Sequence, residues 1–220
     1  MSRPGFFIPY RYRASVSARM AYPAIERLLA AAEPAFRDVL AACDAHASAL
    51  QAIPADPTTP GAPRWRQDWF PTLDAAVAYV MVRERRPRRI VEGGAGHSTR
   101  FLARAIADGG LATELVAIDP QPRATLTGLA ARWEATVVQE ADPALFAALG
   151  PGDLLSVDSS HILMPGTDVD LILNGVLPTL PPGVLVHFHD IMLPDPYPEA
   201  WAWRGYNESQ AVGALIGAGG

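Results

Sequence analysis

The sequence contains no lysine, so all 18 of its basic residues are arginine. A lysine general base is therefore excluded, and arginine cannot replace it because its guanidinium group stays protonated at any useful pH. Histidine is the side chain whose charge changes near neutral pH. The chain has five histidines. Proton transfer at neutral pH is thus expected to depend on histidine or on a carboxylate.

Cysteine and long apolar runs are also scarce. Cys43 is the only cysteine, so no internal disulfide can form, and a reducing compartment fits this composition. No apolar stretch approaches the length of a membrane span, and residues 1–13 are too short and too interrupted by proline for a signal sequence. The net charge of −5 argues against nucleic acid as the main partner. We therefore expect a cytoplasmic protein with neither nucleic acid nor membrane as its partner.

The most informative stretch is residues 89–99, where a short apolar strand runs into a glycine-rich bend and then a helix. Glycine lets the backbone approach a ligand closely and adopt positive φ. Ser98 or Thr99 is expected to cap a helix over residues 99–108, whose first free N–H groups would face the ligand. A tight turn without a ligand is the alternative interpretation of this stretch alone.

The spacing of the bend differs from the dinucleotide fingerprint G-x-G-x-x-G/A, because Thr99 stands at the last small position. Glu92 precedes the glycines, where its charge would repel a pyrophosphate but not a sulfonium or ammonium centre. The turn therefore favours a positively charged nucleoside over NAD. A second apolar run, residues 114–118, ends at Asp119, whose carboxylate is well placed to accept both ribose hydroxyls.

The segments EGGAGHST and VAIDP resemble the class I S-adenosylmethionine-dependent methyltransferases, over most of the chain between residues 65 and 210. This resemblance implies a doubly wound, Rossmann-like α/β sheet and S-adenosylmethionine as cofactor. It assigns the glycine turn, with Glu92, Gly94 and Gly96, to the methionine half of the cofactor and Asp119 to the ribose. Ser98, at the start of the helix, is expected to face the cofactor as well.

A further strand is expected over residues 135–139. Asp142 and Pro143 then have the form of an N-cap and a first helical residue, and we expect a helix over residues 144–149. Glu140 is the candidate to meet the adenine amino group, with Gln139 as its alternative.

Two more apolar runs, residues 153–157 and 183–186, lead into clusters of ionisable side chains. Ligands in an open α/β sheet bind outside the carboxyl ends of the strands, so Asp158, His161, His189 and Asp190 are expected to converge. Within the family this arrangement resembles the metal-dependent, catechol-type O-methyltransferases and a bacterial group that includes cephalosporin-hydroxylase-like proteins. That resemblance implies a metal held by Asp158, His189 and Asp190. It places His161 where the catechol type has its lysine base.

Ligand chemistry bears on the metal. Two carboxylates alone would suit Mg²⁺, whereas the imidazole of His189 shifts the preference toward Mn²⁺, Fe²⁺, Co²⁺ or Zn²⁺. His161 is our candidate for the base that takes a proton from an acidic hydroxyl. Two other roles for His161 stay open, as a metal ligand and as a cap of its loop.

We expect residues 1–63 to form an N-terminal arm, a helical extension and a proline-rich linker, and residues 64–220 to form the S-adenosylmethionine-binding domain. Residues 24–50 have helical spacing, and Pro34 is expected to split or kink that helix. The tryptophan-rich segment 201–208 is either a wall for the acceptor or a hydrophobic plug.

Methyltransferases of this class usually end with two strands that form an antiparallel hairpin, and residues 211–220 are too few to build them. Either the hairpin is absent, or the chain is shortened, or a partner chain completes the sheet. An exposed edge strand would favour a homodimer.

The sequence thus predicts methyl transfer to an oxygen of a small-molecule acceptor, assisted by a divalent metal. Two alternatives stay open: a metal-independent methyltransferase with a histidine base, and a catalytically silent cofactor-binding protein. A metal-dependent hydroxylase is a weaker third alternative.

Overall fold

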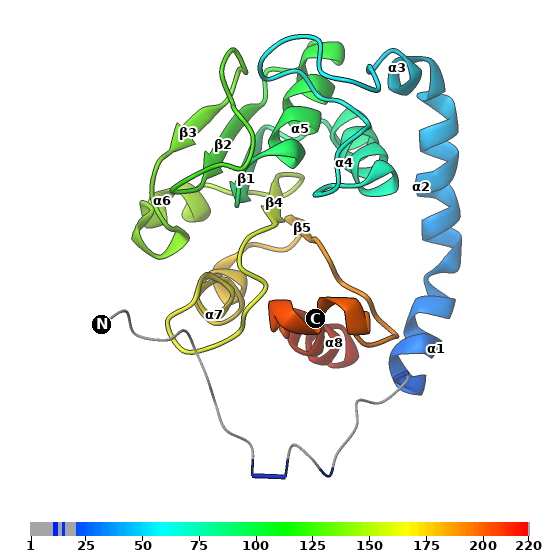
Figure 1. Cartoon of the computed structure of the whole chain (residues 1–220), viewed down its shortest axis with the longest axis vertical. Coiled ribbons are helices and arrows are strands. Elements are labelled where there is room, and N and C mark those ends of the chain that lie inside the picture. The colour runs from blue at the N-terminus through cyan, green and yellow to red at the C-terminus, as the bar shows by residue number, and fades with distance from the viewer. Residues whose placement is uncertain (1–10, 13–14, 16–20, 220) are drawn as a thin grey trace.

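The structure is a computed structural model that describes residues 11–12, 15 and 21–219. Its centre is a sheet of five parallel strands in the order β3-β2-β1-β4-β5 (Figure 1). The five strands are β1 (Arg89–Gly93), β2 (Glu114–Ile118), β3 (Arg132–Glu134), β4 (Leu154–Val157) and β5 (Leu185–Phe188). The strand order reverses between β1 and β4, and such a switch point is where open α/β sheets bind ligands. The predicted doubly wound, Rossmann-like sheet is confirmed.

Helices precede, connect and follow the strands. The α-helices are α1 (Pro23–Ala31), α2 (Glu33–Ala45), α3 (Ala47–Gln51), α4 (Thr72–Arg85), α5 (His97–Asp108), α6 (Pro143–Ala147), α7 (Asp168–Leu171) and α8 (Glu208–Gly217). Shorter helical turns are η2 (Val138–Glu140), η3 (Ile172–Val176), η4 (Leu177–Thr179) and η5 (Glu199–Arg204). Asp142 caps α6 by accepting a hydrogen bond from Ala144 N–H, as predicted.

Other elements pack on both faces of the sheet, and successive side chains of each strand point to opposite faces. Ile90 and Leu154 belong to a core that contains residues of α4 and α5. Their neighbours Val91 and Leu155 belong to a second core, which contains Phe146 of α6 and residues of η3. Parallel pairing of these strands therefore brings their carboxyl ends to one edge of the sheet.

The strand predicted over residues 135–139 is wrong. The observed β3 ends at Glu134, and residues 138–140 form the short helical turn η2. β3 is an edge strand that pairs only with the last three residues of β2, where Ile118 lies opposite Glu134. Because β2 ends there, residues 135–139 have no neighbouring strand, and Val138 turns back into the core instead.

The helix after the glycine turn also starts earlier than predicted. α5 begins at His97, and Gly96 is its N-cap residue, so neither Ser98 nor Thr99 caps it. Thr99 instead accepts a hydrogen bond from Gly96 N–H at 2.9 Å and donates one to the Glu92 carboxyl at 2.5 Å. The Thr99 hydroxyl is therefore bonded to the buried carboxyl group of Glu92 behind the turn.

The helices that precede the sheet lie along one side of the molecule, where α2 packs against α4 and α1 against α8 (Figure 1). Pro34 lies in the first turn of α2, and the predicted long helix is divided into three shorter ones at Ala32 and His46. Residues 52–63 contain neither helix nor strand. Most of the predicted arm, residues 1–20, lies outside the described residues, and the division at residue 63 stays a prediction.

The last described part of the chain follows β5. Between β5 and residue 219 the described chain forms η5 and α8 and adds no strand to the sheet. β3 and β5 are the two edge strands. None of the described helices has the length and apolarity that crossing a membrane requires.

Candidate functional site

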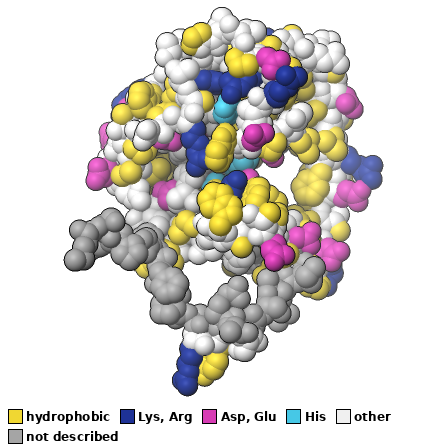
Figure 2. Space-filling model, in the orientation of Figure 1, with side chains coloured by type: hydrophobic (Ala, Val, Ile, Leu, Met, Phe, Trp, Pro, Cys, Tyr) yellow, Lys and Arg dark blue, Asp and Glu magenta, His cyan; other side chains and the backbone are white. Residues whose placement is uncertain are grey.

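The carboxyl ends of the strands open into a cavity of about 440 Å³, a volume within the range of small-molecule sites. The turn after β1 and the loops that follow β2 and β4 form most of its wall, and Asp190 contributes from the end of β5. Figure 2 shows histidine side chains inside a hollow of this face, between arginine and large hydrophobic side chains. The predicted placement of the site at this edge of the sheet is consistent with the geometry.

The glycine turn lies in the cavity wall. Gly94, Gly96 and Ser98 all line the cavity. Gly94 has φ +85, and a Cβ atom on it would lie 1.8 Å from the carbonyl oxygen of Asp158. Only glycine is compatible with this close approach and with that left-handed conformation. The turn is thereby held against the loop that follows β4, with its backbone facing the cavity.

Glu92 lies behind the turn, not among the residues that line the cavity. It is fully buried, and its Oε2 accepts the hydrogen bond from Thr99. Burial raises the pKa of Glu92 to about 8, although hydrogen bonds from Ser98 and Thr99 act in the opposite direction. The side chain therefore supports the turn from the core side.

Asp119 lines the cavity at the end of β2. Its Oδ2 accepts a hydrogen bond from Ala95 N–H at 2.9 Å, and its Oδ1 accepts one from Gln121 N–H at 2.7 Å. These bonds tie the carboxylate to the glycine turn, so the two predicted cofactor contacts are next to each other. Beyond them, Gln139 lines the cavity, whereas Glu140 is exposed and is not part of the wall.

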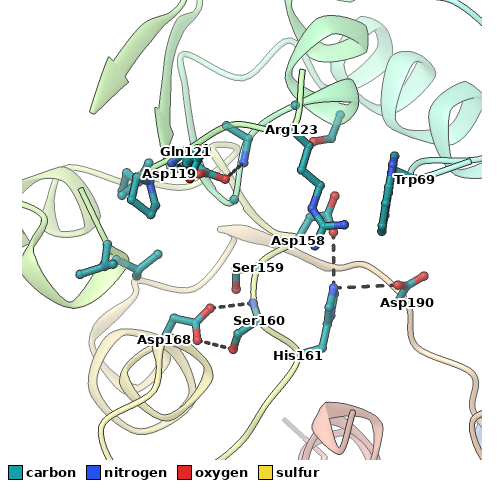
Figure 3. A pocket seen from close by; sticks show the side chains of 18 of the residues that line it. Trp69, Asp119, Gln121, Arg123, Asp158, Ser159, Ser160, His161, Asp168 and Asp190 are labelled. Carbon is teal, nitrogen blue, oxygen red and sulfur yellow. Dashed lines mark hydrogen bonds and ion pairs between the residues drawn. The ribbon is translucent and has the colours of Figure 1, made fainter. Parts of the chain in front are cut away.

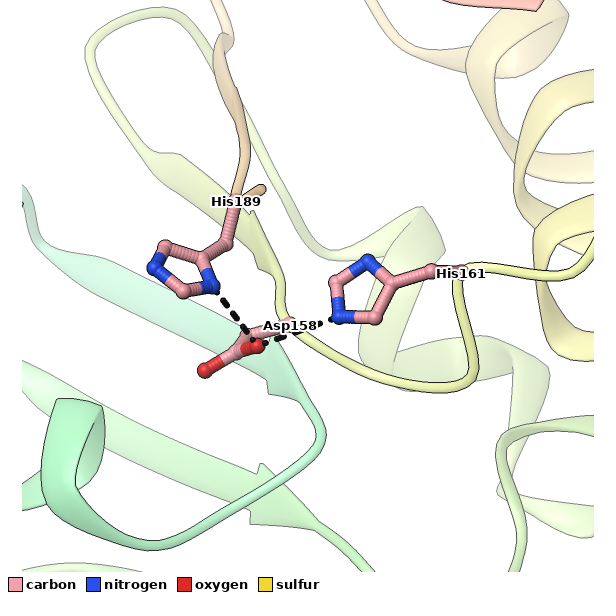
Figure 4. Close-up of side chains that lie close together, drawn as sticks. All are labelled: Asp158, His161 and His189. Atoms are coloured by element: carbon pink, nitrogen blue, oxygen red, sulfur yellow. Dashed lines mark hydrogen bonds and ion pairs between the residues drawn. The ribbon is translucent and has the colours of Figure 1, made fainter. Parts of the chain in front are cut away.

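Asp158, His161 and His189 form a compact cluster that could hold a metal ion (Figure 4). Asp158 Oδ1 lies 3.1 Å from His189 Nδ1 and 3.5 Å from His161 Nε2. Asp190 lies beside them, with Oδ1 3.6 Å from His189 Nδ1 and Oδ2 3.9 Å from His161 Nε2. The four predicted residues therefore converge. Asp158, His161 and Asp190 line the cavity, and His189 is buried behind them.

The electrostatics of the cluster are strongly coupled. Burial alone would raise the pKa of Asp158, but hydrogen bonds from His161 and His189 hold it well below its usual range. Burial disfavours protonation of both histidines, yet hydrogen bonds to Asp158 raise the pKa of His161 to about 9 and that of His189 to about 10. Without a metal the cluster thus holds a carboxylate and two imidazolium groups. A divalent cation would carry the same charge as the two protons it displaced.

Two carboxylates that the sequence did not point to complete the surroundings of the histidines. Glu208, at the start of α8, is fully buried, and its Oε2 lies 2.9 Å from His161 Nδ1. Asp74 of α4 lies 3.5 Å from His189 Nε2. Neither is near the histidines in the sequence, and no local motif marks either of them. The Glu208 bond leaves Nε2 of His161 directed toward Asp158.

The backbone at the cluster is conformationally unusual. His161 has φ 58 and Asp190 has φ 55, and Arg86 is the third non-glycine residue with positive φ in the described chain. A left-handed conformation costs a non-glycine residue roughly 1–2 kcal/mol. Two of the three such residues thus lie at this site, where a functional requirement can maintain the strain.

Residues 91–191 match a family model described as a methyltransferase domain. The matched segment begins within β1 and ends just beyond β5, so it contains the glycine turn, Asp119, Asp158 and His189. No curated protein and no solved structure matches the chain.

Proposed function

The chain carries a methyltransferase domain of the class I, S-adenosylmethionine-dependent kind, and on this basis we propose that it methylates an oxygen atom of a small molecule with the help of a divalent metal. The observation that carries the metal and the oxygen acceptor is the cluster of Asp158, His161 and His189 beside the cavity. A metal at this position would bind an acceptor hydroxyl, and hydroxyl oxygen is a ligand that divalent metals accept.

In this proposal the glycine turn and Asp119 hold the cofactor. When bound, the cofactor supplies an electrophilic methyl group on a sulfonium sulfur. The methionine half of the cofactor contacts the backbone of Gly94 and Gly96 and the start of α5 at Ser98. Asp119 accepts hydrogen bonds from the ribose hydroxyls. Val138 and Gln139, which line the cavity beyond Asp119, give the adenine ring an apolar contact and a polar one.

The residues of the cluster fit a divalent metal. Ligand atoms that share one ion are roughly 3.0–3.5 Å apart for metal–nitrogen bonds of about 2.1 Å. Among the proposed ligands, Asp158 Oδ1 and His189 Nδ1 are 3.1 Å apart, within this range, and His189 Nδ1 and Asp190 Oδ1 are 3.6 Å apart, just above it. We propose that Asp158, His189 and Asp190 hold the metal, which would lower the pKa of the acceptor hydroxyl and orient its oxygen. The imidazole ligand favours Mn²⁺, Fe²⁺, Co²⁺ or Zn²⁺ over Mg²⁺.

His161 is the base of the proposal. Glu208 accepts a hydrogen bond from Nδ1, and a divalent cation on Asp158 would offset the carboxylate charge that raises the pKa of His161. Nε2 would then be unprotonated and could take the acceptor proton as the new carbon–oxygen bond forms and the carbon–sulfur bond breaks. The same Nε2 can instead be a third metal ligand, because it lies 3.5 Å from Asp158 Oδ1. One lone pair cannot serve both roles, so metal affinity of a His161 variant separates them: unchanged affinity supports the base.

A second candidate is a metal-independent methyltransferase in which His161, oriented by Glu208, acts alone. Because the pKa of His161 without a metal is about 9, turnover by this candidate would rise with pH up to about that value. A catalytically silent cofactor-binding protein is the third. The metal-independent methyltransferase would stay active after chelation, unlike the enzyme proposed first. The silent protein would bind the cofactor and form no product.

The deciding experiment is a calorimetric titration of S-adenosylhomocysteine into chelator-treated protein, repeated with Mn²⁺ and with Mg²⁺. Micromolar binding is expected, followed by metal-dependent methylation of a catechol, detected as a mass increase of one methyl group. Product without metal would favour the histidine-only candidate. Binding without product from a panel of hydroxylated acceptors would favour the silent protein, and absence of binding would remove the proposal.

The location and assembly of the protein stay predictions of the sequence. Its single cysteine suggests the cytoplasm, and its edge strands β3 and β5 offer surfaces for a homodimer. We also propose that residues 64–220 are the cofactor-binding domain and that α1 and α2 belong to an extension packed on it.

A further inference from the structure

We propose that the acceptor carries a carboxylate in addition to the hydroxyl that is methylated, and that Arg123 and Arg204 bind this carboxylate at the mouth of the cavity. The inference rests on the proposed function and names the class of its acceptor: a small hydroxy acid.

Both arginines line the cavity beside one aromatic ring. The Cζ atom of Arg123 lies 3.9 Å from the ring centroid of Trp69, and that of Arg204 lies 5.8 Å from the same centroid. All three residues belong to the cavity wall. In Figure 3, Arg123 and Trp69 lie on the side of the cavity that also holds Asp158, His161 and Asp190. The guanidinium groups and the proposed reaction centre therefore share one space.

These two cations lack the close acidic partners that other arginines have. Arg37, Arg66, Arg104 and Arg132 each lie 2.5–2.8 Å from a carboxylate. Within the described chain Arg123 forms no ion pair, and the carboxylate nearest to Arg204 is Asp190, at 4.0 Å. A guanidinium group matches a carboxylate with parallel hydrogen bonds, and a bound acid would supply this partner.

Arg204 is also fixed in place before any ligand arrives. Its Cζ lies 4.3 Å from the ring centroid of Trp201, and its Nη1 donates a hydrogen bond to Tyr206 at 3.2 Å. Its Nε is buried and has no hydrogen-bond partner in the described chain. A buried, unpaired donor is unfavourable unless a ligand satisfies it, and a held side chain loses little entropy on binding.

The distance to the cluster sets the size of the acceptor. Arg204 lies close to the histidines, because Asp190 is 4.0 Å from Arg204 Nη1 through Oδ2 and 3.6 Å from His189 Nδ1 through Oδ1. An acceptor with its hydroxyl at the cluster thus has its carboxylate at Arg204 when a ring or a short chain joins the two groups. The aromatic walls of Trp69 and Tyr206 favour a ring.

Arg123 has a rival role as a partner of the cofactor. It lies next to the glycine turn, since a Cβ on Gly96 would be 3.9 Å from Arg123 Cβ. If Arg123 bound the carboxylate of the cofactor, its replacement would weaken S-adenosylhomocysteine instead of the acceptor. The test therefore measures both affinities.

The test compares 3,4-dihydroxybenzoate with catechol and with methyl 3,4-dihydroxybenzoate, two ligands that keep the hydroxyls but lack the carboxylate charge. Each is titrated into protein saturated with S-adenosylhomocysteine and Mn²⁺. We expect the acid to bind at least about tenfold more tightly than either neutral compound. Arg204→Gln and Arg123→Gln should each remove most of this preference and leave the affinity for catechol and for S-adenosylhomocysteine unchanged. Arg132→Gln, outside the cavity, is the matched control.

Equal affinity for the acid and the neutral compounds, or no binding of the acid, would overturn the inference. A loss of S-adenosylhomocysteine affinity in Arg123→Gln would assign Arg123 to the cofactor and overturn its part in the inference, and the same loss in Arg204→Gln would overturn the rest. Failure of the proposed function would give a different result. The wild-type protein would still prefer the acid and the Arg204→Gln variant would not, but no methylated product would form. If catechol and the acid were methylated with equal kcat/KM and bound with equal affinity, the proposed methyltransferase activity would be supported and the hydroxy-acid acceptor would be excluded.

Discussion

At the scale of single residues, Glu92 is a carboxyl group that the fold keeps away from water. It is fully buried below the glycine turn, its Oε2 is bonded to Thr99, and its Oε1 has no hydrogen-bond partner in the described chain. Burial raises its pKa to about 8 from an ordinary value of 4.5. The native protein therefore binds a proton here that the unfolded chain has already released at neutral pH.

This difference makes the free energy of unfolding depend on pH. Between pH 4.5 and 8 the native state holds the proton and the unfolded state does not, so stability falls as pH rises. The loss from this group is on the order of 2–3 kcal/mol between pH 5 and pH 7, and it stops growing above pH 8. Urea unfolding at a series of pH values should show that Glu92→Gln lacks this loss.

The control is Glu33→Gln, because Glu33 is an exposed residue of α2 paired with Arg37. It should keep the pH dependence of the wild-type protein. If Glu92→Gln and the wild-type protein lost stability in parallel over this range, the carboxyl group of Glu92 would be ionised in the native state.

In the proposed function, His161 is the residue that accepts the proton of the acceptor. His161→Ala is expected to lower turnover by about a hundredfold or more, the usual contribution of a general base, and to leave the affinity for S-adenosylhomocysteine unchanged. Because the alanine leaves Glu208 buried without its partner, His161→Gln is measured beside it as a variant that can still donate to Glu208. Stability by urea unfolding separates loss of the base from loss of the fold.

His46→Ala is the matched control, since His46 pairs with Glu84 on the surface and lies outside the cavity. Turnover in His161→Gln equal to that of His46→Ala would exclude His161 from the reaction.

The sequence predicted those site residues that directly follow a strand. Asp119, Asp158, His189 and Asp190 are recognisable because a mostly apolar run that forms a strand precedes each of them, and parallel pairing then brings the ends of these strands to one edge of the sheet. Glu208 lies 47 residues from His161, and their contact depends on how α8 returns to the sheet. A sequence carries no local pattern for such a contact. The same holds for Trp69 and Arg123, which reach the cavity from separate loops.

At the scale of elements, the clearest structural anchor is Asp153, just before β4. Its Oδ1 accepts hydrogen bonds from Arg88 N–H at 3.0 Å and Arg89 N–H at 2.8 Å, and its Oδ2 accepts one from Gly150 N–H at 2.9 Å. One buried carboxylate thus fixes where β1 begins relative to β4. The register of these two strands sets the position of the glycine turn against the Asp158 loop.

Asp153→Ala removes all three hydrogen bonds and should lower the free energy of unfolding by on the order of 3 kcal/mol, because the N–H groups lose their partners. Asp153→Asn keeps one oxygen acceptor and should cost less. Asp56→Ala, at an exposed residue paired with Arg66, should have little effect. Urea unfolding compares the three, and equal stability of Asp153→Ala and Asp56→Ala would contradict this role.

The bounds of a strand were predicted well where burial of its apolar side chains determines them. β2 has the predicted bounds because its residues from Leu115 to Ile118 are buried. β3 was misplaced because an edge strand is decided by the neighbour it pairs with. Its Trp133 is 48 % exposed, whereas the apolar residues Val137 and Val138 that suggested a strand lie beyond the end of β2. Hydrophobicity therefore located the core of the sheet but not its edge.

At the scale of the whole molecule, the N-terminal helices α1 and α2, which we propose to form an extension, pack on two helices that carry neighbours of the histidine cluster. α2 packs on α4, which carries Asp74 near His189, and α1 packs on α8, which carries Glu208. The extension thus contacts the two helices that supply the outer carboxylates of the histidine cluster. A substitution in α1, far from the cavity, should therefore alter the position of Glu208 beside His161 by loosening the docking of α8.

Ile25 is where this connection can be tested. It is a buried residue of α1, and its Cδ1 lies 3.6 Å from where a Cβ on Gly217 at the end of α8 would be. Ile25→Ala should weaken the docking of α8 by about 2 kcal/mol, so amide hydrogens of α8 should exchange at least about tenfold faster while those of β1 and β4 stay unchanged.

Turnover should fall with unchanged affinity for S-adenosylhomocysteine, because Glu208 then holds His161 less firmly. Leu28→Ala, on the same helix but 44 % exposed, should change neither exchange nor turnover. Faster exchange in α8 with full turnover would show that the firm position of Glu208 is not required for the reaction.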